Sequence, residues 1–401
     1  MSVLVINAGS SSVKYQLISS KDESVQAKGL VERIGSAGSN MKHIYGEETY
    51  EVEKPLENHV EAIKLILAAL LDPSHGVIKS VDEIRAVGHR VVHGGEKFAT
   101  SVLIDDAVIQ AIEESCALAP LHNPANLMGI SACREVMPHT PMVGVFDTAF
   151  HQTMPKKAYL YGLPYDYYKR LKIRRYGFHG TSHRYVSGRA AEIMGQPIEK
   201  LKMIVCHLGN GSSLCAVDGG KSVDTSMGMT PLEGVIMGTR SGSFDPAIIE
   251  YVMQAEGLTV QQVMDVLNKQ SGLLGLSETS NDMRDIKKAS REGNDKCTAT
   301  IEAWAYGIIK TIGAYAAAMN GLDALIFTAG IGENDSLARG IVASGLSILG
   351  VELDRQKNER VRGVEAEISA PNSKVKVFLI PTNEELAIAR DTMAIVIGKR
   401  D

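Results

Sequence analysis

The sequence predicts an α/β protein whose two halves begin with the same kind of β-hairpin. Along the chain, apolar runs typical of buried strands alternate with segments whose hydrophobic residues recur at helical spacing. A strand–turn–strand pattern at residues 3–18 recurs at residues 203–217, and a shift of 201 residues places Ser11 on Ser212. An internal duplication explains this recurrence economically, and a chance likeness between two Gly/Ser-rich hairpins is the alternative.

In the first half, short apolar runs predict strands at residues 3–6, 13–18, 86–88 and 142–146. Hydrophobic residues at helical spacing predict a helix over residues 60–70. Residues 34–54 are polar, rich in glycine and weakly patterned, so we expect them to form a peripheral insertion.

In the second half, apolar runs predict strands at residues 203–206, 214–217, 324–327 and 375–380. Helical spacing of hydrophobic residues predicts helices at residues 260–267 and 303–319. We place a domain boundary near Phe150, after the fourth apolar strand.

The composition excludes several classes of protein. At roughly 150 residues per domain, the 401 residues predict two or three domains. The 42 Lys+Arg and 47 Asp+Glu residues leave a net charge of −5, which provides no positive field for nucleic acid or for an anionic membrane. No apolar run reaches the roughly 18 residues of a membrane-spanning helix, and the N-terminal residues do not resemble a signal peptide. Five scattered cysteines without a C-x-x-C pair are typical of reduced thiols, so we expect a cytoplasmic protein.

Three glycine-rich turns at strand ends are candidates for phosphate binding, because small residues let backbone N–H groups approach an anion closely. These turns are Asn7–Lys14, His207–Ser213 and Thr328–Asn334. None is a Walker A loop, and the missing third glycine argues against a dinucleotide fingerprint. One such turn alone is more often an ordinary hairpin turn, but three together favour a nucleotide ligand.

Two arginines lie among small residues, where neither a helix nor a strand surface explains them. Arg90 comes just beyond a strand, within Gly88–Glu96, and Arg240 lies within the Gly/Ser turn Met237–Ser243. The planar guanidinium suits bidentate recognition of a carboxylate or a phosphate. Surface salt bridges are the alternative, and we favour anion binding at both positions.

His179 and Asp147 are further candidates for the chemistry of the site. His179 lies in a Gly-flanked turn and suits donation to a phosphoryl oxygen. A core histidine, or a helix that begins at His183 and is capped by Thr181 or Ser182, is the alternative. A zinc centre is disfavoured because no Cys/His set has ligand spacing. Asp147 directly follows an apolar strand, where ligand sites concentrate in open α/β sheets.

Another carboxylate, Glu384, follows the strand at residues 375–380 and lies at the start of a helix. Thr382 and Glu385 have the spacing of a capping box, which explains Glu385 and leaves Glu384 free for a metal. Mg²⁺ binds one or two carboxylates and keeps its waters and phosphates, so Glu384 is a candidate magnesium ligand.

Eleven sequence blocks, taken in order, resemble the acetate kinase family from one end of the chain to the other. They are NAGSSSVK, GHRVVHGGE, APLHNP, FDTAFH, YGFHGTSH, HLGNGSS, TPLEG, MGTRSG, SNDMRD, TAGIGEN and IPTNEELAIARD. That family belongs to the sugar kinase, Hsp70 and actin superfamily. The resemblance therefore implies two duplicated actin-like (ribonuclease H-like) ATPase domains, each a mixed sheet flanked by helices, with the active site in the interdomain cleft. The implied domains are residues 1–150 plus 386–401, on the acyl-substrate and phosphate side, and residues 151–385, which bind the nucleotide.

The resemblance also implies a reaction and its residues. The reaction is reversible, in-line transfer of the γ-phosphoryl group of ATP to acetate, giving acetyl phosphate and ADP, with Mg²⁺ or Mn²⁺ as the cofactor. The implied catalytic residues are Arg90, which grips the carboxylate, Asp147, and His179 and Arg240, which stabilise the transferring group. The implied acyl-substrate residues are Arg90, Val92, Leu121, Phe178 and Pro231. The implied metal ligands are Asn7 and Glu384, and the implied ATP-binding residues are Ser10, Ser12, Lys14, His207, Leu208, Gly209, Asn210, Gly211, Asp282, Met283, Arg284, Gly330, Ile331, Gly332, Glu333 and Asn334.

The family pattern makes Asp147 the active-site acid or base. A carboxylic acid substrate is already ionised at pH 7 and has no proton for a base to remove. We therefore expect Asp147 to orient Arg90 or a metal-bound water instead. The family is typically homodimeric, so the resemblance also implies a homodimer.

Two alternatives stay open. A propionate or butyrate kinase of the same family is the close rival, because one methylene in an apolar pocket discriminates by only about 1–3 kcal/mol. A non-catalytic ATP switch of the actin or Hsp70 type is the alternative from another class. Arg90 and Arg240 have no obvious use in a pure nucleotide switch, which favours the kinase.

Overall fold

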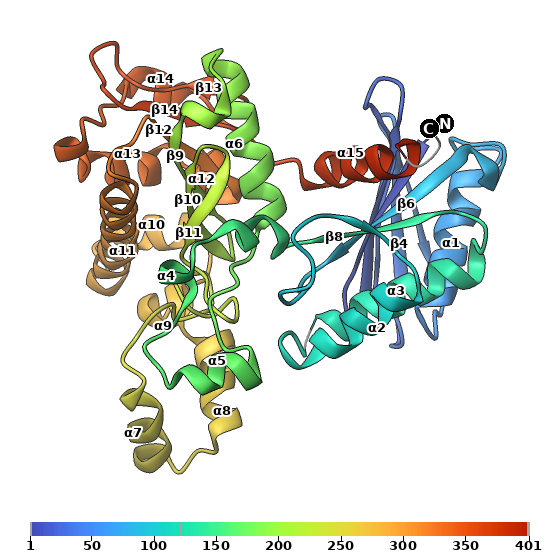
Figure 1. Ribbon diagram of the computed structural model, residues 1–401, viewed down its shortest axis with the longest axis horizontal. Coiled ribbons are helices and arrows are strands. Elements are labelled where there is room, and N and C mark those ends of the chain that lie inside the picture. Colours follow the sequence, from blue (N-terminus) through green and yellow to red (C-terminus); the bar gives the residue numbers. More distant parts are fainter. Residues whose placement is uncertain (1, 121, 399–401) are drawn as a thin grey trace. The chain divides into compact units, whose positions relative to one another are not determined.

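The chain folds into two units, each built on one mixed β-sheet (Figure 1). The computed structural model describes residues 2–120 and 122–398. Unit 1 comprises Met1–Gln152 and Asn383–Asp401, and unit 2 comprises Thr153–Thr382. Each sheet combines parallel and antiparallel strands and has helices packed on it, which confirms the predicted α/β class.

The sheet of unit 1 has the strand order β5-β4-β3-β2-β1-β6-β8-β7. Its strands are β1 (Ser2–Ala8), β2 (Ser12–Ser19), β3 (Val25–Glu32), β4 (Asn40–Tyr45), β5 (Glu48–Glu53), β6 (Ile84–Val91), β7 (Val102–Leu103) and β8 (Met142–Phe146). Strands β1 to β5 pair antiparallel as a meander, whereas β6 is parallel to β1 and β8 is parallel to β6. The carboxyl ends of β1, β6 and β8 therefore meet at one edge of the sheet, where α/β proteins commonly bind ligands.

The sheet of unit 2 has the order β11-β10-β9-β12-β14-β13. Its strands are β9 (Lys202–Leu208), β10 (Ser212–Asp218), β11 (Lys221–Thr225), β12 (Ala324–Thr328), β13 (Ala366–Glu367) and β14 (Lys376–Leu379). As in unit 1, the first strand pairs with an antiparallel meander on one side and with two successive parallel strands on the other. This shared topology confirms the internal duplication that the two hairpins predicted.

The helices of unit 1 cover both faces of its sheet (Figure 1). They are α1 (His59–Leu71), α2 (Asp106–Glu114), α3 (Asn123–Val136) and α15 (Glu384–Ile397). Helices α1 and α3 pack on the face that carries Leu4 and Ile6, and α15 packs on the opposite face, which carries Val5. Gly88 of β6 permits the close approach of α15, because a Cβ at this position would lie 2.5 Å from Oγ1 of Thr392.

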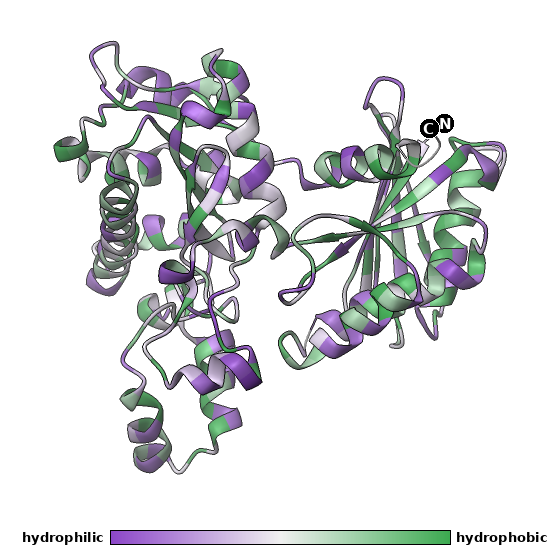
Figure 2. Cartoon of the chain, in the orientation of Figure 1, coloured by the Kyte–Doolittle hydropathy of each residue, from purple (hydrophilic) through white to green (hydrophobic). Residues whose placement is uncertain are grey.

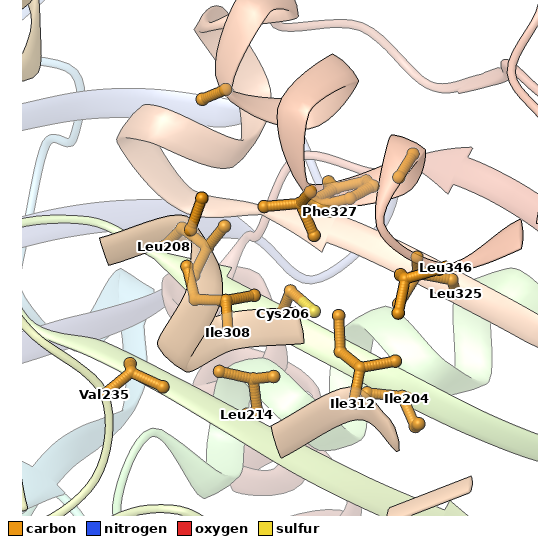
Figure 3. Close-up of a cluster of buried hydrophobic side chains, with 14 of the residues drawn as sticks. Ile204, Cys206, Leu208, Leu214, Val235, Ile308, Ile312, Leu325, Phe327 and Leu346 are labelled. Atoms are coloured by element: carbon orange, nitrogen blue, oxygen red, sulfur yellow. The ribbon is translucent and has the colours of Figure 1, made fainter. Parts of the chain in front are cut away.

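The core of unit 2 lies between its sheet and the long helix α11 (Figure 3). Ile204, Leu214 and Phe327 of the strands pack there with Ile308 and Ile312 of α11. Figure 2 shows hydrophobic residues along the strands and mixed polarity along the surface helices. The helices of unit 2 are α4 (Lys156–Tyr159), α5 (Tyr165–Leu171), α6 (Gly180–Met194), α7 (Ala247–Glu256), α8 (Val260–Asp265), α9 (Gly272–Ser277), α10 (Met283–Arg291), α11 (Asp295–Met319), α12 (Ala329–Asn334), α13 (Ser336–Ser344) and α14 (Arg355–Arg360).

Residues 34–54 lie at the periphery as expected, but they also contain two strands that were not predicted, β4 and β5, which extend the sheet at its edge. Met41 and His43 are buried, and Lys42 between them is exposed. The alternation typical of a strand is present, but it is short and lies among the charged residues that usually protect a sheet edge.

Two predicted helices have different limits in the structure. The helix expected at residues 260–267 ends as α8 at Asp265 and continues as a π-helical stretch, Val266–Gln270. The helix expected at residues 303–319 begins earlier, at Asp295, where the side chain of Asn294 caps it. Among the helices formed by residues 2–120 and 122–398, none is long and apolar enough to cross a membrane.

Candidate active site

Arg90, Asp147 and Glu384 form a charged cluster in unit 1. Arg90 lies within β6, not just beyond a strand as expected, and Asp147 directly follows the parallel neighbour β8. The guanidinium donates to both carboxylate oxygens of Asp147, with 3.2 Å between Nε and Oδ1 and a shorter bond between Nη2 and Oδ2. Its Nε also lies 3.6 Å from Oε2 of Glu384. The fold thus brings together three residues that the sequence places far apart.

Burial and charge act against each other in this cluster. The Asp147 side chain is 1% exposed, whereas that of Arg90 is 21% exposed. Burial alone would lower the pKa of Arg90, but the neighbouring carboxylates of Asp147 and Glu384 raise it above its ordinary value. Burial raises the pKa of Glu384, and the charge of Arg90 opposes that shift. Arg90 is thus a firmly charged cation whose side chain remains partly accessible.

Two buried asparagines of α3 hold the backbone that follows β6. The Asn126 side chain accepts the N–H of Val92 at 3.0 Å and donates to the last carbonyl of β1 at 2.9 Å, so it ties two strand ends together. The Asn123 side chain bonds both the N–H and the carbonyl of His93. Val92 is buried in this loop, and Leu121 lies outside the described residues. Neither asparagine was predicted, although the APLHNP block contains Asn123.

The turn between β1 and β2 presents its small residues at the same sheet edge. The Ser12 carbonyl accepts a backbone N–H from within the turn at 2.8 Å, and Ser10 is exposed. Beside the turn, a cavity of about 270 Å³ is lined by Asn7, Lys14 and Glu385 together with residues of β2, β3 and β4. The predicted metal ligand of β1 and the predicted phosphate-binding lysine of β2 therefore share one cavity.

Glu384 is the first residue of α15, because Asn383 and not Thr382 caps this helix. The Asn383 side chain accepts the N–H of the third helical residue at 3.0 Å, so the predicted capping box of Thr382 and Glu385 is wrong. Asparagine competes well with threonine at an N-cap, and its position one residue later shifts the helix start. Of the two acidic residues in the first turn, Glu384 faces Arg90 of β6, and Glu385 lines the cavity beside β1.

In unit 2, His179 and Arg240 meet over Gly211. A Cβ on Gly211 would lie 3.4 Å from Nη1 of Arg240 and 3.5 Å from Nε2 of His179. Nη1 of Arg240 also donates to the carbonyl of Pro231 at 3.1 Å, and burial lowers the pKa of Arg240. A glycine in the β9–β10 turn thus keeps open a small space between two predicted catalytic side chains.

The backbone of His179 is held in a rarely populated conformation. Its φ of 56° lies in the left-handed region, and α6 begins at Gly180, three residues earlier than expected and without the expected hydroxyl cap. A non-glycine residue in this region costs free energy that the surrounding contacts must offset. Phe178, which is buried directly before it, and Ser213, whose hydroxyl bonds its Nδ1 at 2.9 Å, provide such contacts.

Most of the predicted nucleotide-binding residues of unit 2 gather around one cavity of about 760 Å³. Segments distant in the sequence contribute to it, namely the β9–β10 turn and residues of α10, α12 and α13. The predicted residues that line it are Gly209, Asn210, Asp282, Met283, Arg284, Gly330, Ile331 and Asn334. The volume lies within the range of small-molecule sites, so the cavity is large enough for a nucleotide.

This cavity also has cations that the sequence did not indicate. Lys287, Arg291 and Arg362 line it together with the predicted Arg284. The ammonium of Lys287 lies 2.5 Å from a carboxylate oxygen of Asp335. Lys287 and Arg291 follow the quoted SNDMRD block on the same helix, but the segment that contains Arg362 matches no motif.

Other predicted nucleotide-binding residues face elsewhere. Leu208 is 1% exposed and packs in the hydrophobic core. Oε1 of Glu333 accepts the N–H of Ala329 at 2.8 Å and that of Thr382 at 3.1 Å, so this carboxylate joins two backbone segments. Residues 330–334 lie in the short helix α12 and not in a turn, and the fully buried Arg339 donates to the carbonyls at the end of that helix.

The oxygen donors of unit 1 fit a hard divalent cation that is bound largely through water and phosphate. Within residues 2–120 and 122–398, no group of three or more His, Cys, Asp or Glu side chains could hold a metal ion. Asn7 and Glu384 are donors of the type that Mg²⁺ prefers, and Mg²⁺ needs only one or two protein carboxylates. The carboxylate of Glu384 is 20% exposed and its pKa is raised by burial, so it gains from a cation beside it.

Comparison with known proteins establishes the family. The model of the acetokinase family matches residues 2–390. The acetate kinase of Thermotoga maritima is 60% identical over 398 residues, which cover 99% of each chain. The crystal structure of Porphyromonas gingivalis acetate kinase matches with a TM-score of 0.96 and 49% identity, and that of a Francisella tularensis propionate kinase with 0.91 and 42%. Both matches cover 98% of this chain and 99% of the other. The chain therefore belongs to the acetokinase family.

Proposed function

We propose that the protein is an acetate kinase, which transfers the γ-phosphoryl group of ATP reversibly to acetate. The observation that carries the proposal is the Arg90–Asp147 pair, in which a buried carboxylate fixes a partly exposed guanidinium at the carboxyl edge of a sheet. A guanidinium held in this way suits bidentate binding of a carboxylate substrate. Relatives named acetate kinase, which match the whole chain, make acetate the first candidate for that substrate.

The acceptor is assigned to unit 1. Arg90 binds the carboxylate of acetate, and Asp147 orients the guanidinium without taking a proton, because acetate is already ionised at neutral pH. The two bonds from Arg90 to Asp147 support this positioning role. Val92, which is buried in the loop that follows β6, is proposed to contact the methyl group.

The phosphoryl donor is assigned to unit 2. ATP is proposed to bind the cavity of about 760 Å³, where lysine and arginine side chains offset phosphate charge. His179 and Arg240 donate to the oxygens of the transferring phosphoryl group, and their shared space over Gly211 supports this assignment. Phosphoryl transfer depends mainly on such positioning and charge stabilisation, so no covalent step on the protein is required.

Mg²⁺ is the proposed cofactor, with Asn7 and Glu384 as its protein ligands and Mn²⁺ as a substitute. When bound, the ion neutralises phosphate charge and helps to orient the transferring group. Lys14, Ser10 and Ser12 are proposed to contact phosphate oxygens from the β1–β2 turn. The exposed serine and the cavity shared by Lys14 and Asn7 support this arrangement.

We also propose that the protein is a cytoplasmic homodimer, on the family resemblance alone. Sedimentation velocity of the purified chain tests the dimer directly. A single species at the mass of one chain, across the working concentration range, would exclude it.

A propionate kinase is the second candidate, because a propionate kinase of known structure matches 98% of the chain with a TM-score of 0.91. Hydroxylamine trapping of acyl phosphate, with Mg-ATP and acetate, propionate or butyrate in parallel, separates the two candidates. We expect the highest kcat/KM with acetate. A preference for propionate would transfer the name to the second candidate, and no trapping with any acid would refute both.

A further inference from the structure

We propose that Ser213, backed by His183, holds the imidazole proton of His179 on Nε2, so that His179 faces the transferring phosphoryl group as a neutral hydrogen-bond donor. This inference rests on the proposed function, which places a phosphoryl oxygen beside His179.

The serine hydroxyl lies between two imidazole rings. Its Oγ is 2.9 Å from Nδ1 of His179 and 2.7 Å from Nε2 of His183. Ser213 and His183 are both 0% exposed, whereas His179 is partly exposed. Neither buried residue can touch a substrate, so both act through His179 as positioning residues.

The single proton of the Ser213 hydroxyl couples the tautomers of the His179 and His183 rings. A serine hydroxyl has one proton and cannot donate to both ring nitrogens, so at least one of them must itself be an N–H donor. If Ser213 donates to Nδ1 of His179, then His183 donates from Nε2 and the proton of His179 is on its own Nε2. If Ser213 donates to His183 instead, His179 donates from Nδ1 and presents a bare Nε2.

Only the arrangement with the His179 proton on Nε2 suits the side of the ring that lies over Gly211. Nε2 of His179 shares the space over Gly211 with the guanidinium of Arg240. A phosphoryl oxygen is an acceptor, so a bare ring nitrogen would repel it and an N–H would bind it. Of the two neutral tautomers, only the one with its proton on Nε2 can donate there, and the positive charge of Arg240 would repel a charged ring.

A third histidine, His207, holds the His179 ring in place. The ring of His207 stacks on that of His179, with 4.1 Å between centroids and 21° between planes. Nδ1 of His207 is itself bonded to Oγ of Ser182 at 2.8 Å, and Thr382 donates to that oxygen at 2.7 Å. The hydroxyl therefore acts on a ring whose plane is already fixed, so it selects the tautomer and does not merely orient the side chain.

The tautomer can be read directly from ¹⁵N chemical shifts of the imidazoles in the wild-type protein, with the His179 signals assigned through their loss in His179→Gln. We expect His179 and His183 both to carry the proton on Nε2. A proton on Nδ1 of His179, or a charged ring, would overturn the inference. This measurement needs no substrate, so it decides the inference even if the wild-type protein forms no acyl phosphate, which would instead refute the proposed function.

Kinetics of variants test the consequence. Ser213→Ala should mix the tautomers of His179 and lower kcat roughly 10- to 100-fold with little change in KM for ATP, as for other partners that orient a functional histidine. Ser213→Thr keeps the hydroxyl and should restore both the tautomer and kcat. Ser187→Ala is the matched control, because Ser187 is a buried serine of α6 whose hydroxyl bonds only a helix carbonyl in the described contacts. A Ser213→Ala protein with one Nε2–H tautomer and wild-type kcat would overturn the proposal.

Discussion

At the scale of single residues, the neighbours of Arg90 fix the orientation of its side chain. Asp147 holds two of its nitrogens, and Glu384 adds a second negative charge 3.6 Å from Nε. A lone arginine at a strand end is flexible and gains little from a surface ion pair. Fixed by a carboxylate that is 1% exposed, the same side chain becomes a preorganised anion site.

Asp147→Asn should therefore lower kcat by about 100-fold and raise KM for acetate much less. The asparagine keeps the size of the side chain, and Arg90 keeps its charge, so acetate still binds. The guanidinium of Arg90 loses one of its two hydrogen bonds to residue 147, so it no longer holds the carboxylate of acetate in line for phosphoryl transfer. Steady-state kinetics with acetate varied at saturating Mg-ATP checks this, and a large rise in KM with kcat preserved would contradict it.

Individual site residues could be predicted where their chemistry conflicts with their surroundings. Arg240 among glycines and Asp147 after an apolar strand are of this kind. Arg362 could not be predicted, because it reaches the cavity of unit 2 only through tertiary folding and has no local pattern. Thr382 was assigned to a cap because its spacing fits, but the neighbouring Asn383 competes for the same role.

At the scale of an element, strand β6 directs two neighbouring side chains, those of His89 and Arg90, to opposite faces of the sheet. Arg90 points to the face covered by α15, so its neighbour His89 points to the opposite face, where it is 2% exposed. Burial lowers the pKa of His89 to about 3. The folded chain therefore needs this histidine neutral.

His89→Gln should reduce the sensitivity of the protein to mild acid. The unfolded chain binds a proton at His89 near its ordinary pKa of 6.5, whereas the folded chain does not until about 3. The stability from neutral His89 is thus present above pH 6.5 and is lost as the pH falls toward 3. Between pH 7 and pH 5, the wild type should lose about 2 kcal/mol more than the variant.

Urea unfolding at the two pH values measures this difference. His139→Gln, at an exposed histidine of the same unit, is the control and should unfold like the wild type. Equal pH dependence in His89→Gln and the wild type would show that burial of this ring does not contribute.

Helix α12 depends on one buried cation. Arg339 donates to the carbonyls of Gly332 and Glu333 at 2.9 and 3.1 Å and to both oxygens of Asn358. Its neighbours are mostly carbonyls, so burial lowers its pKa to about 10 although Asp335 opposes the shift. The guanidinium fork therefore holds the end of the helix that borders the proposed nucleotide site.

Arg339→Lys should lose about 2–3 kcal/mol of stability, because an ammonium cannot reach carbonyls on both sides as the planar fork does. KM for ATP should rise several-fold while KM for acetate stays near its wild-type value, since α12 lines the cavity assigned to the nucleotide. Arg360→Lys, at an exposed arginine of α14, serves as the control. Equal effects on both KM values would indicate a general loss of folding.

Most elements with strong patterns could be predicted, and the misses have physical causes. The strands at residues 3–6, 203–206 and 324–327 lie in the centres of sheets and are continuously apolar. Strands β4 and β5 lie at the sheet edge, where one polar face and few buried residues weaken the alternation. The short helix α12 follows its strand without a loop, so its glycines resembled a turn.

At the scale of the whole molecule, the duplication organises the protein. Both sheets place their first strand in the centre and build their candidate sites at the carboxyl ends of the parallel strands. Two short hairpins were enough to predict this, because the same kind of Gly- and Ser-rich turn recurs between apolar strands at a shift of 201 residues. The cavity of unit 2 could not be predicted from the pattern, because four distant segments form it.

Nucleotide binding should protect specific backbone segments from hydrogen exchange. A non-hydrolysable ATP analogue with Mg²⁺ should slow exchange at residues 209–211, 281–291 and 329–337, which line the cavity or adjoin it. Residues 247–256, which form α7 and line neither of the two cavities described above, serve as the internal reference and should not change. Protection confined to unit 1 would contradict the assignment of ATP to unit 2.

Attack by a carboxylate oxygen of acetate on the γ-phosphorus of ATP is the central claim, and the fate of that oxygen tests it most directly. Acetyl phosphate made by the protein from ¹⁸O-labelled acetate and Mg-ATP is examined by ³¹P NMR. The claim predicts a phosphorus resonance shifted by one directly bonded ¹⁸O, which comes from the acetate. Acetyl phosphate without ¹⁸O on phosphorus, or no acyl phosphate from any short-chain acid, would contradict it.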